Sequence, residues 1–118
     1  MSQRFVPVPA DAIRKLMIEC GFKRIEHAGS EEVYQRDHDK DPHYHVRVYS
    51  SIPVDANRVR GCGRDAIRVV AGVHRSGLWF CVYRAARTYR TGTVEGVLER
   101  TRQRMREAYQ AINQRIKQ

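Results

Sequence analysis

The chain has 118 residues, of which 42% are hydrophobic, and a formal net charge of +9. This length suits one domain and excludes two ordinary ones, and the hydrophobic fraction excludes wholesale disorder. With no apolar run of about 18 residues and no signal-peptide layout at the start, we expect one domain over 1–118, in the cytoplasm and without a membrane partner.

The first predicted element is a helix over 10–20. Pro7 and Pro9 forbid a helix before it, apolar residues then recur at spacings of three and four, and Gly21 ends it. From Phe22 onward the period changes to two, which predicts strands rather than helices. The predicted strands cover 22–27, 31–37, 44–52, 65–74 and 78–84, with a turn at Ser76 and Gly77 between the last two.

A long amphipathic helix is predicted over 92–118, where apolar residues form one stripe and Thr91 or Thr93 caps the start. The short connections between strands favour antiparallel pairing. The predicted fold class is therefore α+β, a single domain in the order α-β-β-β-β-β-α. Both helices are expected on one face of an antiparallel sheet.

The positive charge is unevenly distributed along the chain. Residues 1–55 carry eight Lys or Arg against nine Asp or Glu, whereas residues 56–118 carry fourteen against four. Clustered guanidinium groups gain affinity for polyanions by releasing condensed counterions from phosphates. The distribution therefore favours nucleic acid as the partner, although an arginine-rich genome would also enrich solvated surfaces in Arg.

Strict alternation predicts which strand residues face away from the helices. If Val46, Val48, Ile67 and Val69 lie under the helices, the opposite face carries aromatic rings interleaved with arginines. Such a face can stack unpaired bases while cations hold the backbone, or it can be buried by the N-terminal segment or in a homodimer. The predicted outward residues are Tyr34, Arg36, His45, Arg47, Tyr49, Arg68, Trp79 and Tyr83.

Two further basic groups extend this predicted interface. Arg58, Arg60 and Arg64 surround two glycines, which permit close approach of backbone amides to a phosphate, although a plain surface connection would have the same composition. Three more arginines lie just before the last helix. They are Arg84, Arg87 and Arg90.

The segment 37–45 contains three aspartates and three histidines, which is the pattern closest to a metal site. The weak candidates for ligands are Asp39, His43 and His45. A metal beside a basic groove would favour phosphodiester hydrolysis. However, no HExxH motif or paired His/Cys spacing is present, so a solvated turn, with no metal and no cofactor, is the expectation.

Residues 11–51 also resemble the opening of HicA-type toxins, through Asp11 to Leu16, Cys20-Gly21-Phe22, Gly29-Ser30 and the strand ending at Val48-Tyr49. That family consists of small ribonucleases with a double-stranded-RNA-binding-like α-β-β-β-α fold. The resemblance implies a helix followed by a sheet. The family's histidine after Gly-Ser is Glu31 here, so the resemblance implies the fold without the ribonuclease activity.

Together these patterns predict a non-enzymatic protein that binds nucleic acid, with single-stranded DNA or RNA favoured because a duplex hides its bases from a flat aromatic face. One alternative is a metal-dependent nuclease that uses the Asp/His turn. The other is a basic accessory or inhibitor protein, of the kind encoded by phages or mobile elements, that docks on an acidic protein partner.

Overall fold

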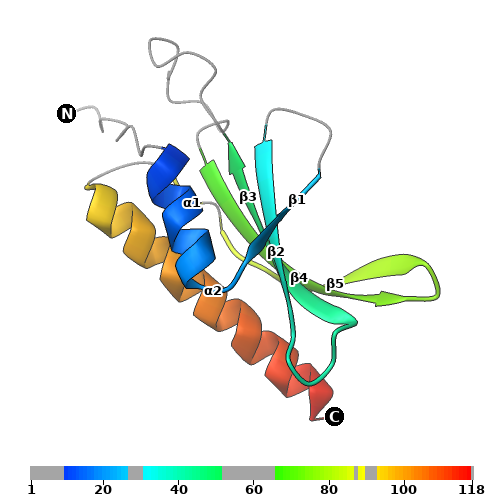
Figure 1. The fold of residues 1–118 in the computed structure, drawn as a ribbon. Coiled ribbons are helices and arrows are strands. Elements are labelled where there is room, and N and C mark those ends of the chain that lie inside the picture. The colour runs from blue at the N-terminus through cyan, green and yellow to red at the C-terminus, as the bar shows by residue number, and fades with distance from the viewer. Residues whose placement is uncertain (1–9, 27–30, 52–65, 87, 90–92, 118) are drawn as a thin grey trace.

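The structure of the protein is a computed structural model, and it describes residues 10–26, 31–51, 66–86, 88–89 and 93–117. It confirms the α+β class and the predicted order of elements, with both helices on one face of an antiparallel sheet (Figure 1). A two-residue strand that was not predicted is added after the fifth. The elements are α1 (Ala10–Glu19), β1 (Lys23–Ile25), β2 (Glu31–Asp37), β3 (Tyr44–Ser51), β4 (Ala66–Arg75), β5 (Leu78–Arg84), β6 (Thr88–Tyr89) and α2 (Val94–Ile116).

The sheet follows the chain closely. Its strands pair in the order β1-β2-β3-β4-β5, and β6 pairs with the start of β4. The predicted turn between β4 and β5 is confirmed, because Ser76 and Gly77 both have positive φ, as a tight two-residue hairpin requires. The tip of this hairpin extends away from both helices (Figure 1). Residues 27, 52, 65, 92 and 118, at the ends of predicted elements, lie outside the described residues.

Helix α1 is anchored to the core and ended by local hydrogen bonds. Its buried residues Ile13, Leu16 and Met17 repeat at the spacing that places them on one helical face. The amide of Phe22 donates to the Met17 carbonyl at 2.8 Å, and that of Gly21 donates to the Ile18 carbonyl at 3.0 Å. This pair of bonds requires a left-handed residue, and Gly21 supplies it with φ of +80°.

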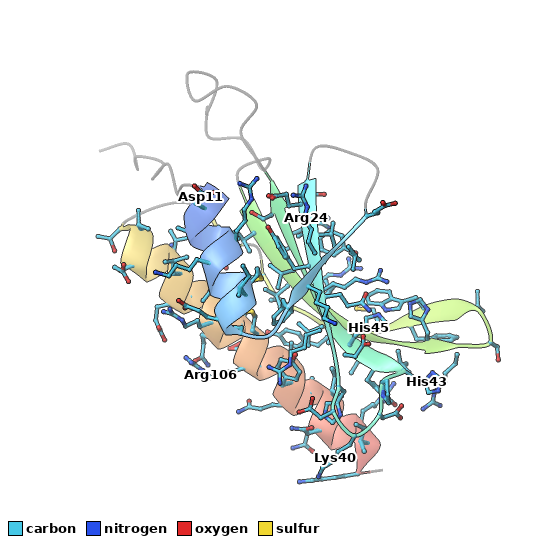
Figure 2. All side chains as sticks on the ribbon, in the orientation of Figure 1. Asp11, Arg24, Lys40, His43, His45 and Arg106 are labelled. Carbon is cyan, nitrogen blue, oxygen red and sulfur yellow. The ribbon has the colours of Figure 1, made fainter. Side chains whose placement is uncertain are left out.

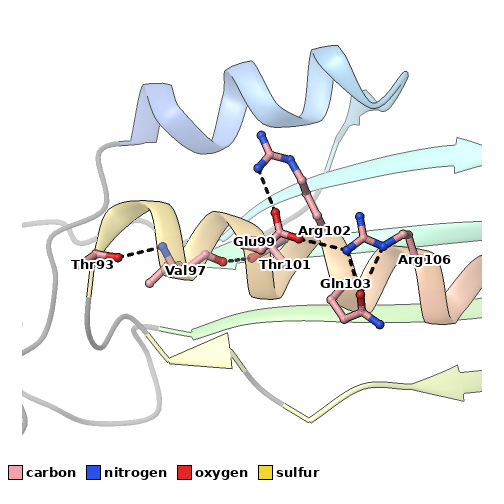
Figure 3. A network of polar contacts seen from close by, with 8 residues as sticks. Thr93, Val97, Glu99, Thr101, Arg102, Gln103 and Arg106 are labelled. Carbon is pink, nitrogen blue, oxygen red and sulfur yellow. Dashed lines mark hydrogen bonds and ion pairs between the residues drawn. The ribbon is translucent and has the colours of Figure 1, made fainter.

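Helix α2 begins at the predicted cap residue Thr93, whose hydroxyl accepts a hydrogen bond from the Gly96 amide at 3.0 Å (Figure 3). One side of the helix is buried through Val97, Thr101, Met105, Ala108 and Ile112, among others. No helix of the described residues is long and apolar enough to span a bilayer.

The core lies between the helices and one face of the sheet. Val46, Val48, Ile67 and Val69 are at most 1% exposed, which confirms the predicted alternation on β3 and β4. On β5 the alternation is interrupted, because Gly72 pairs with Cys81 but Ala71 pairs with Tyr83. Val82 is therefore an extra residue, a β-bulge, and beyond it the inward and outward positions exchange.

Candidate nucleic-acid interface on the open sheet face

The face of the sheet opposite the helices carries most of the predicted interface residues that the structure describes. We call it the open face, because neither helix covers it (Figure 1). Its positions follow from the register of β2 to β5, since they alternate with the residues of the core. The central ones are Val33, Gln35, His45, Arg47, Tyr49, Arg68, Val70, Gly72, His74, Trp79, Cys81 and Arg84.

Trp79 and Arg47 form the first of two arginine–aromatic pairs on this face. The Arg47 guanidinium carbon lies 5.5 Å from the centre of the Trp79 ring, within the range of a cation–π contact. The Arg47 Nε also donates to Gln35 at 2.9 Å, which fixes the direction of the side chain. A Cβ on Gly72 would overlap two carbons of the indole, so the glycine gives the ring a seat directly on the backbone of β4.

Arg68 and Tyr49 form the second pair, directly across from each other on β4 and β3. The Arg68 guanidinium carbon lies 4.6 Å from the centre of the Tyr49 ring. Its Nη2 is 3.2 Å from the Glu31 carboxylate, and both side chains of this ion pair are partly exposed. An exposed pair of this kind contributes little stability, so a phosphate can replace the carboxylate at small cost.

His45 lies beside the first pair, across from Gly72 on β4, and is almost fully buried. The Trp79 indole nitrogen donates to its Nε2 at 2.9 Å, so the ring proton of the neutral histidine sits on Nδ1. The His74 ring centroid is 4.9 Å away. Burial, reinforced by the positive charge of Arg47 and by His74, lowers the pKa of His45 to about 4.

We therefore expect His45 to stay neutral from pH 5 to pH 8. Because the folded pKa is below the ordinary value, the unfolded chain takes up the proton first, and the folded protein loses stability as the pH falls from about 6.5 toward about 4. An NMR titration of the ring carbons measures this directly, and the fluorescence of Trp79 should change only near the same low midpoint. A His45 midpoint above pH 6 would contradict this electrostatic environment.

Two residues of β2 that were predicted to face outward lie on the helix-covered face. Tyr34 pairs with Val48 and is a buried member of the core, and Arg36 pairs with Val46. Arg36 donates to the Cys20 carbonyl at 2.9 Å and lies over the Tyr109 ring of α2. The outward prediction was wrong because Val33 and Tyr34 are adjacent on β2 and both buried. The alternation of this strand was therefore compatible with either residue facing the helices.

Tyr83 is a third correction. It lies past the bulge, so it points toward the helices, and its hydroxyl donates to Glu107 of α2 at 2.7 Å. Burial and the Glu107 carboxylate raise the pKa of Tyr83 to about 12. Arg84 follows it onto the open face, opposite Val70, and is exposed. A one-residue bulge leaves no trace in the alternation of a strand this short, so the sequence alone did not reveal the exchange.

Five of the predicted arginines lie outside the described residues: Arg58, Arg60, Arg64, Arg87 and Arg90. On α2, three arginines are bound to the helix's own acids: Glu99 accepts from Arg102 at 3.4 Å and from Arg106 at 3.1 Å (Figure 3), and Arg104 lies 3.2 Å from Glu107. The outer surface of α2 is therefore a less favourable place for phosphate than the open face.

The Asp/His turn does not gather its weak metal candidates at one point. His45 belongs to the open face, where its Nε2 accepts from Trp79, and Figure 2 shows it apart from His43 at the turn. His43 and Asp39 are both exposed. Asp39 lies 3.7 Å from Arg36 on the other side of the sheet. Among the residues that the structure describes, no three His, Cys, Asp or Glu side chains converge as metal ligands do.

The sequence did not indicate His74, whose ring packs against His45 at a tilt of 41° and whose Nε2 lies 3.5 Å from Arg47. The same alternation that placed Arg68 outward also places His74 outward, six positions along the same strand. It also missed His38, Tyr109 and Asn113, which meet between the β2-β3 turn and α2. His38 is more than seventy positions from the other two in the sequence, so no local pattern brings it to them.

Comparisons of the chain with protein-family models, with curated proteins and with solved structures gave no significant match. The functional interpretation therefore depends on the geometry and chemistry of the chain itself.

Proposed function

We propose that the protein binds single-stranded DNA or RNA on the open face of its sheet. The observation that supports this most strongly is the pair of neighbouring arginine–aromatic contacts, Arg47 on Trp79 and Arg68 on Tyr49, on the face opposite the helices. Aromatic rings accept the faces of unpaired bases, and the adjacent guanidinium groups reach the phosphates.

The charge distribution supports the same face. Arg47, Arg68 and Arg84 are distributed over three adjacent strands. The acceptors nearest to the first two are the side-chain amide oxygen of Gln35 and the partly exposed carboxylate of Glu31, both of which a phosphate oxygen can replace. A flat sheet cannot enter the grooves of a duplex as a helix does, so a strand with free bases is the favoured ligand.

The direct test is fluorescence anisotropy of labelled single-stranded DNA, duplex DNA and RNA of equal length, titrated with protein over a range of salt. We expect the single strands to bind most tightly, with affinity that falls as salt rises. They should also quench the fluorescence of Trp79, which is the chain's single tryptophan. Weak binding to all three ligands would remove this proposal and favour an acidic protein partner.

A matched pair of variants locates the interface. Arg47→Gln should weaken binding and lower the slope of log K against log salt by about 0.7, the value for one phosphate contact with a single strand. Arg106→Gln removes the same charge from α2, where Arg106 is bound to Glu99, and should change neither quantity much. Equal effects of the two substitutions would mean that net charge, rather than the open face, drives binding.

A further inference from the structure

A pocket of about 550 Å³ lies between the β2-β3 turn and the C-terminal end of α2, away from the open face. Its volume falls within the range of small-molecule sites. Figure 2 shows Lys40 of the turn beside the last turn of the helix. The pocket is lined by three cations, Arg36, Lys40 and Lys117, and by one acid, Asp39.

The charges of the pocket favour an anion with about two negative charges. Three cations less one carboxylate leave a net charge of +2, which outweighs the partial charge of about −0.5 at the end of a helix. A phosphate monoester carries about −1.5 to −2 at neutral pH, whereas a carboxylate carries −1. Asp39 is a weak competitor, because it is 84% exposed and 3.7 Å from Arg36.

Tyr109 supplies an unused donor. Its hydroxyl oxygen is buried and has no hydrogen-bond partner among the described residues. A buried hydroxyl without a partner destabilises the fold unless a ligand or a water molecule forms a hydrogen bond with it. Tyr109 lines the pocket, and the Arg36 guanidinium carbon lies 5.2 Å from the centre of its ring. Burial raises the pKa of Tyr109, which keeps the proton in place for donation.

His38 fixes a second donor. Its Nδ1 accepts from the amides of Lys40 and Asp41, so its Nε2 carries the proton and donates to the Asn113 Oδ1 at 2.7 Å. With its oxygen held in this way, the Asn113 side chain presents its NH₂ group on the other side. The ring of Tyr109 and the side chain of Ile116 add apolar wall to the same pocket.

We propose that this pocket binds the phosphate group of a small phosphate monoester, with Arg36, Lys40 and Lys117 as its cations and Tyr109 and Asn113 as its neutral donors. A free nucleoside monophosphate and the 5′-phosphate end of a nucleic acid chain carry the same group. The site shares no residue with the open face, so it stands or falls independently of the function proposed above.

Isothermal titration calorimetry with inorganic phosphate, AMP and adenosine tests the site. Phosphate and AMP should bind and adenosine should not. Arg36 is left unchanged because it also bonds the Cys20 carbonyl. Lys40→Gln and Lys117→Gln, at exposed positions, should each raise the Kd for AMP about five- to tenfold. Asp39→Asn removes the competing carboxylate and should lower the Kd for AMP.

Tyr109→Phe gives a signature that a purely structural role does not. It should weaken AMP binding about fivefold while leaving the melting temperature of the free protein unchanged or higher, because it removes an unanswered hydroxyl. Arg106→Gln on the outer surface of α2, where the guanidinium is paired with Glu99, serves as the control and should leave AMP binding unchanged. A 5′-phosphorylated trinucleotide that displaces AMP better than its 5′-hydroxyl form would identify a chain end as the source of the phosphate.

Two results would overturn the proposal. One is equal affinity for AMP and adenosine, which would mean that the phosphate is not recognised. The other is an AMP affinity that none of the substitutions at Lys40, Asp39, Tyr109 and Lys117 changes.

Discussion

Trp79→Ala is expected to weaken the binding of single-stranded nucleic acid by about 1 to 3 kcal/mol, the range for the loss of one base–aromatic stack. The indole is the largest ring of the open face and rests on Gly72, so a base stacked on it has a firm support. Anisotropy with the same labelled strand, at one salt concentration, measures the change. Trp79→Phe should recover part of the lost affinity, because it keeps an aromatic face.

The adjacent residue provides the matched control. Phe80 is 50% exposed but pairs with Val73, so it points to the opposite side of the same strand. Phe80→Ala removes a more exposed ring without touching the open face, and should leave affinity nearly unchanged. If the two substitutions weaken binding equally, the hairpin tip rather than the open face contacts the ligand. Thermal unfolding of both variants verifies that the sheet is intact.

Glu32→Gln is expected to cost about 1.5 to 3 kcal/mol of folding stability at neutral pH, the range for hydrogen bonds that involve a charged group. The Glu32 carboxylate is 3% exposed, and its two oxygens accept from Arg14 Nε at 2.7 and 3.0 Å. Tyr34 also donates to it at 3.2 Å, and Arg24 lies at 3.7 Å. Urea unfolding at pH 7 measures the difference.

The direction of the Glu32 pKa shift determines how this stability difference changes with pH. Burial alone would raise the pKa of Glu32, but the opposing hydrogen bond and charge of Arg14 prevail and lower it. The ionised carboxylate therefore stabilises the fold fully above its ordinary pKa, about 4.3, and less as the pH falls through its lowered folded value. Glutamine does not titrate, so the gap between wild type and variant should narrow in acid.

Glu99→Gln is the control, because Glu99 is 61% exposed where it meets Arg102 and Arg106 on the surface of α2. It should change stability far less than the buried substitution. A gap for Glu32→Gln that is the same at pH 2.5 and pH 7 would mean that folding does not lower the pKa of Glu32, which would contradict the role given to Arg14.

The elements themselves were predictable because each has a strong local signal. Periodicity identified both helices, and Thr93 and Gly21 marked a start and an end through bonds made within a few residues. The central strands β3 and β4 alternate without interruption, so Val46 and Ile67 were placed correctly on the core side. On the same strands, Arg47, Tyr49 and Arg68 were placed correctly on the open face.

The flanking strands were less predictable because contacts with distant parts of the chain determine which of their residues face the core. On β2 the inward residues Glu32 and Arg36 are charged, and only partners elsewhere in the chain make their positions favourable: Arg14 for the first, the Cys20 carbonyl and Tyr109 for the second. Charged residues read as outward until such partners are known. The phosphate pocket could not be predicted either, because residues from the β2-β3 turn and from α2, far apart in the sequence, line it together.

Because the Trp79 ring packs directly on Gly72, the order in which these two positions can be substituted is restricted. Any side chain at position 72 collides with the indole and also meets the Phe80 carbonyl oxygen at 2.7 Å, so a larger residue there requires both the replacement of Trp79 and a shift of the β5 backbone. The reverse order is open, since a smaller residue at position 79 merely uncovers the glycine. The two positions are therefore epistatic, and while Trp79 remains, only glycine fits at position 72 of β4.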